Sequence, residues 1–231
     1  MSIRQLTLNV SIPDRYSLEN FIPGANGELL ARLDGVAGGE EGADCIYIWG
    51  PAGSGKSHLL QALCRTVAAN GRKVAYVSLA AGECRPELLE GLADAALVCI
   101  DDVDAVAGDR AWETALLALY EGARGRTSIV WAASLPPQGL PLVLADLASR
   151  FRAGLVYGLH ALSDEEKLQA LQARARERGF ELSDDAGLYV LKRYPRDMHA
   201  LFALLDRLDR ASLEAQRRIT IPFLRRLEGE V

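Results

Sequence analysis

Apolar residues gather in five short runs within the first two thirds of the chain, and longer segments of helical periodicity separate these runs. Each run is almost continuously apolar and rich in Val, Ile and aromatic residues, which is typical of parallel strands that helices cover on both faces. The sequence therefore predicts an α/β fold with a five-stranded parallel sheet. The strands are expected at 44–50, 73–79, 96–101, 128–133 and 154–159, and the helices at 56–69, 109–121 and around 142–152.

The pattern changes after Leu162, where amphipathic helices follow one another without a strand-like run. Ser163 and Glu166 form a capping-box pattern at the start of the first helix, which is expected to end at Gly179. Further helices are expected from about Ser183 to before Pro195, over 196–214 and from about Pro222. The glycine-rich segment 35–44 is interpreted as a mobile connection. The expected domains are a leader (1–15), an α/β nucleotide-binding subdomain (16–160) and a small all-helical subdomain (161–231).

Composition and charge narrow the class of protein. The 231 residues are 49% hydrophobic and 25% charged, which is ordinary for a globular protein. The 26 Lys and Arg against 31 Asp and Glu give a net charge of −5, so strong direct DNA binding is not expected. The sequence has neither a run of 18 apolar residues nor a signal-peptide pattern, which favours a cytoplasmic protein without a membrane partner. The spacing of the four cysteines favours reduced, mostly buried thiols over disulfides or a zinc site.

The clearest chemical signal is GPAGSGKS at positions 50–57, a complete GxxxxGK[ST] motif between an expected strand and an expected helix. Its glycines let backbone N–H groups turn toward phosphates. Lys56 is placed to reach the β- and γ-phosphates, and the Ser57 hydroxyl to ligate Mg²⁺. The alternative is a glycine-rich turn that binds nothing. The candidate nucleotide ligands here are Gly50, Pro51, Ala52, Gly53, Ser54, Gly55, Lys56, Ser57 and His58.

Two acidic residues, Asp101 and Asp102, end the third apolar run. A carboxylate at the carboxyl end of a strand beside the P-loop can hold Mg²⁺, and we assign this role to Asp101. Asp102 would orient or deprotonate the attacking water, and its reach, which is shorter than that of Glu, predicts slow intrinsic ATP hydrolysis. The alternative is that these residues cap the following helix.

Three further segments carry weaker signals. Arg150 stands near the end of the helix before the last strand, where it either stabilises transition-state charge on a neighbour's nucleotide or interacts with the helix dipole. Arg196, in YPRDM, is either a residue that swings over the phosphates or an ordinary exposed arginine. The leader QLTLNV (5–10) has apolar residues at every second position, which fits an edge strand or an extended peptide that docks on a partner.

Taken together, these residues resemble the AAA+ ATPases and, within them, the DnaA family of bacterial replication initiators. The resemblance covers nearly the whole chain, through SLENFIPGANGELL (17–30), GPAGSGKSHLLQAL, VCIDDVDAVAG, LASR and YPRDMHAL. The tail segments LSDEEKLQALQARARERGFEL and LDRLDRASLEAQRRITIPF are similar to the Hda type, the DnaA-related proteins that inactivate the initiator. The resemblance implies a P-loop AAA+ domain followed by a helical lid, and the basic DNA-reading domain into which DnaA continues is not expected.

The resemblance also implies nucleotide-site roles. Phe21 and Ile22 belong to the family's adenine-pocket segment, and Arg196 matches the sensor 2 position. Ser134 falls at sensor 1, where the family usually has Asp, and this departure bears on how the chain would sense a γ-phosphate. The implied ligands are ATP or ADP with Mg²⁺.

The implied partners are the DNA polymerase III sliding clamp and DnaA in its ATP form. Gln5, Leu6, Leu8 and Val10 would dock on the clamp. The clamp-bound protein would then place Arg150 as a finger at the nucleotide of DnaA and promote hydrolysis, which limits replication initiation. Self-association into a dimer is left open.

Other classes of protein fit less well. A P-loop kinase predicts a substrate pocket and gives no reason for the leader or for an arginine acting between subunits. A helicase loader of the DnaC type expects a helicase-binding domain before the P-loop, and only 49 residues precede Gly50. A DnaA-like adaptor that binds nucleotide structurally and stimulates no hydrolysis stays open.

Overall fold

The structure is a computed structural model that describes residues 17–18, 21–39, 45–81, 84–195, 198–215 and 219–229. These residues form two compact units. The first contains the described residues up to Pro51 together with Gly55–His160, and the second contains Ala52–Ser54 together with the described residues from Ala161 onward. No helix in these ranges has both the length and the apolar character that crossing a bilayer requires.

A parallel sheet forms the centre of the first unit, and its described strands number five, as predicted from the sequence. They are β1 (Cys45–Trp49), β2 (Val74–Ser78), β3 (Leu97–Asp101), β4 (Ser128–Ala133) and β5 (Leu155–Gly158). Their order is β2-β3-β4-β1-β5, and every residue of β3 and β4 is buried. Because the carboxyl ends of parallel strands share one edge, this order brings the segments that follow β1, β3 and β4 together.

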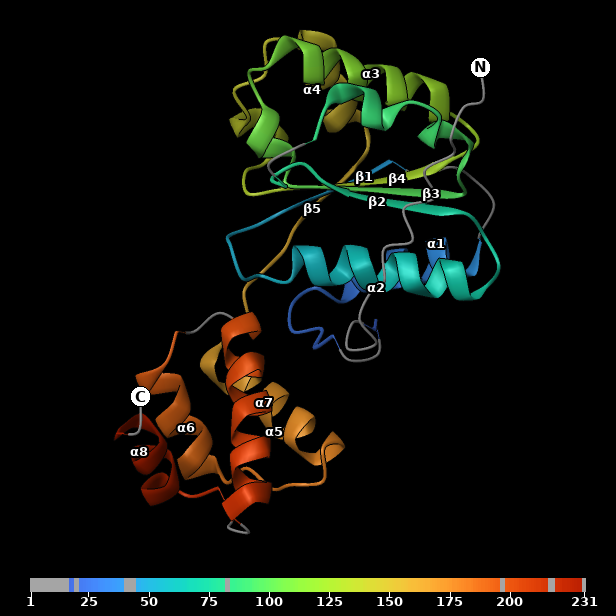
Figure 1. Ribbon diagram of the computed structural model, residues 1–231. Coiled ribbons are helices and arrows are strands. Elements are labelled where there is room, and N and C mark those ends of the chain that lie inside the picture. The colour runs from blue at the N-terminus through green and yellow to red at the C-terminus, as the bar shows by residue number, and fades with distance from the viewer. Residues whose placement is uncertain are drawn as a thin grey trace. The chain divides into compact units, whose positions relative to one another are not determined.

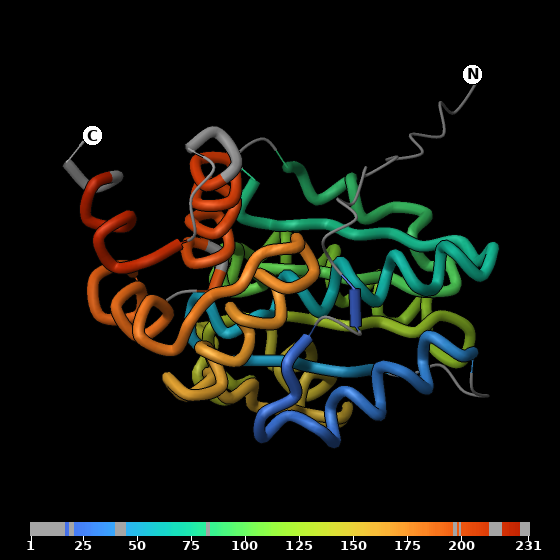
Figure 2. The backbone as a smooth tube through the Cα atoms, turned by 90° about the horizontal axis from the view of Figure 1, so that it is seen from below, coloured from blue at the N-terminus to red at the C-terminus, as the bar shows by residue number. Residues whose placement is uncertain are grey.

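Helices cover both faces of the sheet (Figure 1). α1 (Gly27–Gly38) and α2 (Lys56–Ala69) lie side by side on one face, and α3 (Arg110–Ala123) and α4 (Ala145–Ala153) cover the other (Figures 1 and 2). Successive residues of β1 enter opposite cores, because side chains alternate along a strand. Ile46 and Ile48 pack with α1 and α2, whereas Tyr47 packs with residues of α3 and α4. Short 3₁₀ turns occupy Pro86–Leu89, Leu92–Asp94, Val103–Val106 and Pro137–Gly139.

The interpretation of 35–44 as a connection is wrong at its beginning, because α1 continues to Gly38. Leu29, Leu33 and Val36 recur at helical spacing and are buried, so packing against α2 outweighs the low helix propensity of glycine. The helix ends at Gly38 and is capped by Gly39, whose φ of 81° is the left-handed conformation that glycine adopts readily. Residues 40–44 lie outside the described ranges.

α3 and α4 begin later than the sequence suggests. Asp109 is the N-cap of α3, and its carboxylate accepts hydrogen bonds from the backbone N–H groups of Ala111 and Trp112 at 2.8 and 3.3 Å. α4 begins at Ala145 rather than near 142, because the backbone of its N-cap, Leu144, is extended (φ −96°, ψ 106°). The N–H groups of Val143 and Leu144 donate to the Glu113 carboxylate.

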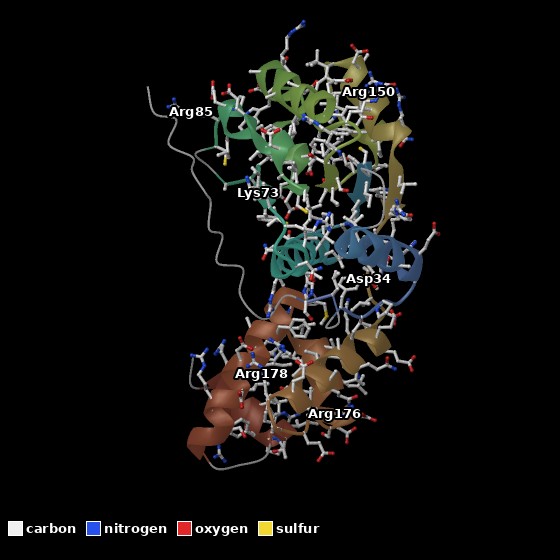
Figure 3. The ribbon with its side chains drawn as sticks, turned by 90° about the vertical axis from the view of Figure 1, so that its right-hand side faces the viewer. Asp34, Lys73, Arg85, Arg150, Arg176 and Arg178 are labelled. Atoms are coloured by element: carbon white, nitrogen blue, oxygen red, sulfur yellow. The ribbon has the colours of Figure 1, made fainter. Side chains whose placement is uncertain are left out.

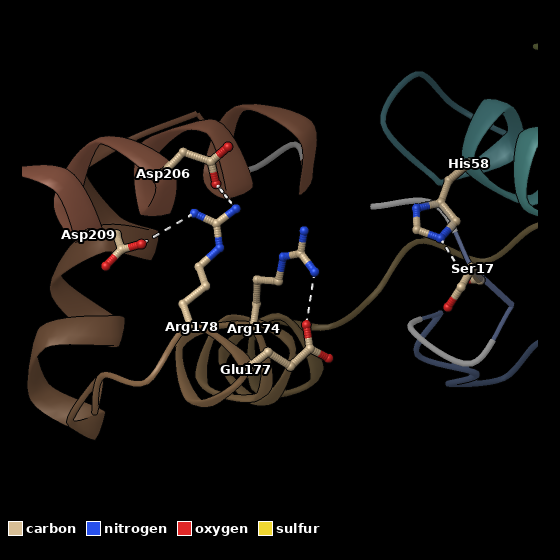
Figure 4. A network of polar contacts seen from close by, with 7 residues as sticks. All are labelled: Ser17, His58, Arg174, Glu177, Arg178, Asp206 and Asp209. Carbon is tan, nitrogen blue, oxygen red and sulfur yellow. Dashed lines mark hydrogen bonds and ion pairs between the residues drawn. The ribbon is translucent and has the colours of Figure 1, made fainter. Parts of the chain in front are cut away.

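The second unit is helical. Its elements are α5 (Asp164–Glu177), α6 (Asp184–Arg193), α7 (Met198–Ala215) and α8 (Ile221–Gly229). The predicted capping box is confirmed at α5, where Ser163 Oγ accepts from the Glu166 N–H at 3.2 Å and Glu166 Oε2 accepts from the Ser163 N–H at 2.7 Å. Arg178, at the end of α5, pairs with Asp206 and Asp209 of α7 and ties these two helices together (Figure 4).

All four cysteines are free thiols, and two of them, Cys64 and Cys99, are fully buried. Cys45 and Cys84 are only partly buried, so burial of the thiols is less complete than expected.

Candidate nucleotide-binding site

The P-loop (residues 50–57) connects β1 to α2 at the carboxyl edge of the sheet. Gly53 and Gly55 have φ values of 75° and 102°, which favour glycine, and such turns form backbone concavities that bind anions. A Cβ at Gly55 would lie 2.8 Å from Cε2 of Phe21, so the Phe21 ring also requires glycine here. The 14-residue α2 begins directly behind the loop and adds the favourable field of a helix N-terminus.

Lys56 is folded onto the P-loop backbone. Its Nζ donates to the carbonyl oxygens of Gly50 at 2.7 Å and Pro51 at 3.0 Å, and the residue is only 9% exposed. Burial lowers the pKa of the Lys56 ammonium, while the charges of Asp101, Asp104 and Asp102 oppose this shift. The loop thus holds a buried cation whose charge these three nearby carboxylates favour.

Asp101 lies at the end of β3 and is 1% exposed. Its carboxylate accepts from the Tyr76 hydroxyl at 2.9 Å and from the Asp102 N–H at 3.0 Å, and it is hydrogen-bonded to the Ser57 side chain. Burial raises the pKa of the Asp101 carboxyl, the hydrogen bond with Ser57 acts against this, and the charge of Asp102 adds to it.

Ser57 and Asp101 therefore meet, as the metal assignment requires. A hydroxyl and a carboxylate are hard oxygen donors that suit Mg²⁺, which usually completes its shell with phosphate oxygens and water. Within the described residues, no group of three or more His, Cys, Asp or Glu side chains could hold a metal ion by itself. The residues fit a cation that arrives with a nucleotide rather than one that the protein alone retains.

Asp102 has a φ of 57°, and among the described residues it is the one non-glycine residue with positive φ. Asp tolerates this conformation better than most residues. Its Oδ2 accepts from the Ser78 hydroxyl at 2.8 Å, at the end of neighbouring β2. The left-handed turn begins the 3₁₀ segment Val103–Val106, which carries Asp104.

Asp104 is a site residue that the sequence interpretation missed. Its carboxylate accepts from both the backbone N–H and the hydroxyl of Ser134, at 2.9 and 2.6 Å. Burial acts to raise the pKa of Asp104, but the hydrogen bonds from Ser134 and the charge of Lys56 leave that pKa below its ordinary value. Ser134, which the sequence interpretation assigned to sensor 1, thus donates two hydrogen bonds to a carboxylate from another segment. The sequence signal that could have identified Asp104 is the third acidic residue in DDVD (101–104), which follows the strand.

The segment expected at the adenine pocket contacts the P-loop side of α2. The ring of Phe21 lies edge-on to that of His58, with centroids 5.7 Å apart, and His58 Nε2 is 3.1 Å from the Ser17 carbonyl oxygen (Figure 4). Ile22 is half-buried beside Phe21 in the sequence. Arg196 and the leader residues Gln5, Leu6, Leu8 and Val10 lie outside the described residues.

Arg150 is part of α4, on the other side of the sheet from α1 and α2 (Figure 3). Its Nη2 is 2.9 Å from Oε1 of Glu121, and its guanidinium lies over the Tyr120 ring at 5.6 Å. Both partners belong to α3. Among the described residues, Arg150 has no contact of this kind with the P-loop of its own chain.

Comparison with known proteins identifies the family. The model of the bacterial DnaA ATPase domain matches residues 12–158, which is more than half of the chain. The chain belongs to the bacterial DnaA ATPase family. The model of the Hda lid domain matches residues 164–227. Both matches in one chain confirm the resemblance to DnaA-related AAA+ proteins of the Hda type.

Solved structures of DnaA show the same fold. Domain III of DnaA from Thermotoga maritima has a TM-score of 0.76 at 22% identity, over 91% of this chain and 94% of that one. AMPPCP-bound DnaA from Aquifex aeolicus has a TM-score of 0.70 at 24% identity, over 85% of this chain and 66% of that one. DnaA bound to AMPPCP and single-stranded DNA has a TM-score of 0.72 at 23% identity, over 85% of this chain. This chain spans only 65% of the length of that relative.

Proposed function

We propose that this protein is a negative regulator of replication initiation that binds adenine nucleotide with Mg²⁺ and promotes hydrolysis of ATP bound to DnaA. One observation carries the proposal: a DnaA ATPase domain and a lid of the Hda type occur in the same chain.

The chain's own nucleotide would be held at the P-loop. The backbone of Gly50–Gly55 would cradle the phosphates, and Lys56 would exchange its two carbonyl partners for phosphate oxygens. Ser57 and Asp101 would hold Mg²⁺, which when bound neutralises phosphate charge. Phe21, Ile22 and His58 would flank the adenine, and Arg196 would approach the phosphates from the lid. Two of the solved DnaA relatives are bound to AMPPCP, which supports the binding of an adenine nucleotide by this chain.

Within this site, Asp102 would orient the attacking water. Its hydrogen bond with Ser78 and its short side chain support slow intrinsic hydrolysis. Ser134 would report on the nucleotide only together with Asp104, because its hydroxyl and N–H are both engaged by that carboxylate.

Arg150 would act in trans, at the nucleotide of a DnaA molecule. Its partners lie on α3, and its side chain is 39% exposed, which supports a role outside its own P-loop. There the guanidinium would stabilise the charge that develops on the transferred phosphoryl group. The leader residues Gln5, Leu6, Leu8 and Val10 would bind the DNA polymerase III sliding clamp and bring this activity to DNA.

The test is single-turnover hydrolysis of DnaA-bound ATP, with the protein and DNA-loaded clamp in excess. Arg150→Ala should abolish stimulation, with a loss of about 10³-fold or more where an arginine finger is removed, and should leave nucleotide and clamp binding unchanged. Arg124→Ala, which removes an exposed cation at the end of α3, serves as the matched control. Stimulation that survives Arg150→Ala refutes the trans role. Intact clamp and nucleotide binding without any stimulation by the wild-type protein would indicate an adaptor.

A further inference from the structure

Arg150 is held by one turn of α3. Tyr120 and Glu121 are consecutive residues, and they contact the same guanidinium from two sides, through its face and through Nη2. The Arg150 and Glu121 side chains are 39% and 43% exposed. An ion pair that is so well solvated contributes little to folding stability. The ion pair therefore matters more for where it places the Arg150 guanidinium than for the free energy of unfolding.

The helix that carries Arg150 is fixed to α3 at its other end as well. Glu113, near the start of α3, is fully buried, and its carboxylate accepts from the N–H groups of Val143 and Leu144 at 2.7 to 3.0 Å. Leu144 is the N-cap of α4. From Glu113 to Glu121 an α-helix rises about 12 Å, so α3 supports α4 from its N-cap to Arg150. Both the backbone and the charged group of Arg150 are therefore placed by α3.

The guanidinium keeps donors for a further ligand. Arginine has five N–H donors, and one nitrogen, Nη2, pairs with Glu121. Nε is buried and has no hydrogen-bond partner among the described residues. The conformation of the Arg150 side chain is therefore held by the Tyr120 ring and the Glu121 carboxylate and not by a hydrogen bond at Nε. A long side chain loses rotamer freedom when a ligand immobilises it, and holding it beforehand removes that cost from binding.

We propose that Tyr120 and Glu121 are positioning residues for Arg150. They hold the guanidinium in one conformation near the end of α4, in which it can bind a phosphate of the nucleotide on a neighbouring DnaA molecule. This inference rests on the proposed trans role of Arg150. It adds two residues that touch neither nucleotide and act only through the arginine.

The kinetic test measures two quantities: the maximal rate of DnaA-bound ATP hydrolysis, and the concentration of this protein that gives half of that maximal rate. Glu121→Ala and Tyr120→Leu should each lower the maximal rate about 2- to 5-fold, and about 5- to 20-fold together. The half-saturating concentration should not change. Tyr120→Phe, which keeps the aromatic ring, should have the wild-type maximal rate. Arg124→Ala is the control for a changed surface charge. A maximal rate that rises in Glu121→Ala would mean that the pair restrains Arg150, which overturns the proposal.

A second measurement does not depend on hydrolysis. The heteronuclear NOE of the Arg150 Nε–Hε group in the free protein should report a rigid side chain, and it should fall in Tyr120→Leu. An Arg150 signal as mobile as that of exposed Arg124 in the wild-type protein refutes the positioning role. If Arg150→Ala abolishes stimulation while Glu121→Ala and Tyr120→Leu do not lower it, positioning fails and the proposed function stands. If Arg150→Ala retains stimulation, the trans role of Arg150 fails, and the positioning role of Tyr120 and Glu121 fails with it.

Discussion

Glu113→Gln should destabilise the α/β unit strongly, although the two side chains have nearly the same shape. The Glu113 carboxylate is 0% exposed. Oε1 accepts from the N–H groups of Gly108 at 2.8 Å and Val143 at 3.0 Å, and Oε2 accepts from Val143 at 3.0 Å and Leu144 at 2.7 Å. Because both oxygens are used, either orientation of a glutamine amide turns its NH₂ group toward a backbone donor.

The magnitude follows from these contacts. Removing the charge reduces each remaining bond from about 1.5–3 to about 0.5–1.5 kcal/mol, and a buried donor without an acceptor costs about 1–3 kcal/mol. A carboxylate is itself costly to bury, so the expected net loss in the free energy of unfolding is about 2–4 kcal/mol. For a chain of this size, that corresponds to a fall in Tm of roughly 4–16 °C.

The assay is urea unfolding followed by tryptophan fluorescence, because Trp49, Trp112 and Trp131 all lie in the α/β unit. Glu121→Gln is the matched control. It changes the same residue type on the same helix at a side chain that is 43% exposed, and it should cost less than about 1 kcal/mol. A Glu113→Gln variant within about 0.5 kcal/mol of the wild type would refute the account of how α4 is anchored.

Four further substitutions test the phosphate site, the P-loop geometry and the capping box of α5. Lys56→Ala should weaken adenine-nucleotide binding by roughly 30-fold or more in calorimetry, since a buried charge that would contact phosphate is lost, and an unchanged Kd would contradict the phosphate site. Gly55→Ala should destabilise the α/β unit by about 1–3 kcal/mol in urea unfolding, because φ is 102° and Phe21 is in the way; wild-type stability would contradict that geometry. Ser163→Ala should destabilise the lid by about 1 kcal/mol, measured by circular dichroism, and no change would contradict the capping box. Hydrogen bonds from Ser163 lower the pKa of Glu166 from 4.5, so the advantage of the wild type over Glu166→Gln should be full above that pH and vanish as the pH falls through the lowered pKa.

The sheet could be predicted from the sequence because its strands are buried on both faces. β3 and β4 are buried at every residue, so their sequences are continuous apolar runs that stand out from the helices around them. The capping box of α5 was also predictable, since it depends on two residues three positions apart. α1 was not predicted, because the glycines near its end obscure the helical spacing of the buried positions Val36 and Ala37.

The parts that sequence analysis missed depend on contacts between distant segments. Asp104 reaches Ser134, 30 residues later, only because Asp102 adopts a left-handed turn and the following 3₁₀ segment redirects the chain. In the sequence, Glu113 is an ordinary helix residue, because its partners Val143 and Leu144 lie about 30 residues further along the chain. The P-loop motif, by contrast, requires a local backbone geometry that its own glycines encode.

The most direct test of the central claim is the rate at which ATP bound to DnaA is hydrolysed when this protein is added with and without DNA-loaded sliding clamp. Hydrolysis should accelerate only when the protein and the clamp are both present, and Arg150→Ala should remove the acceleration. Hydrolysis that stays at the rate of DnaA alone, with the protein demonstrably bound to nucleotide and to the clamp, would contradict this claim.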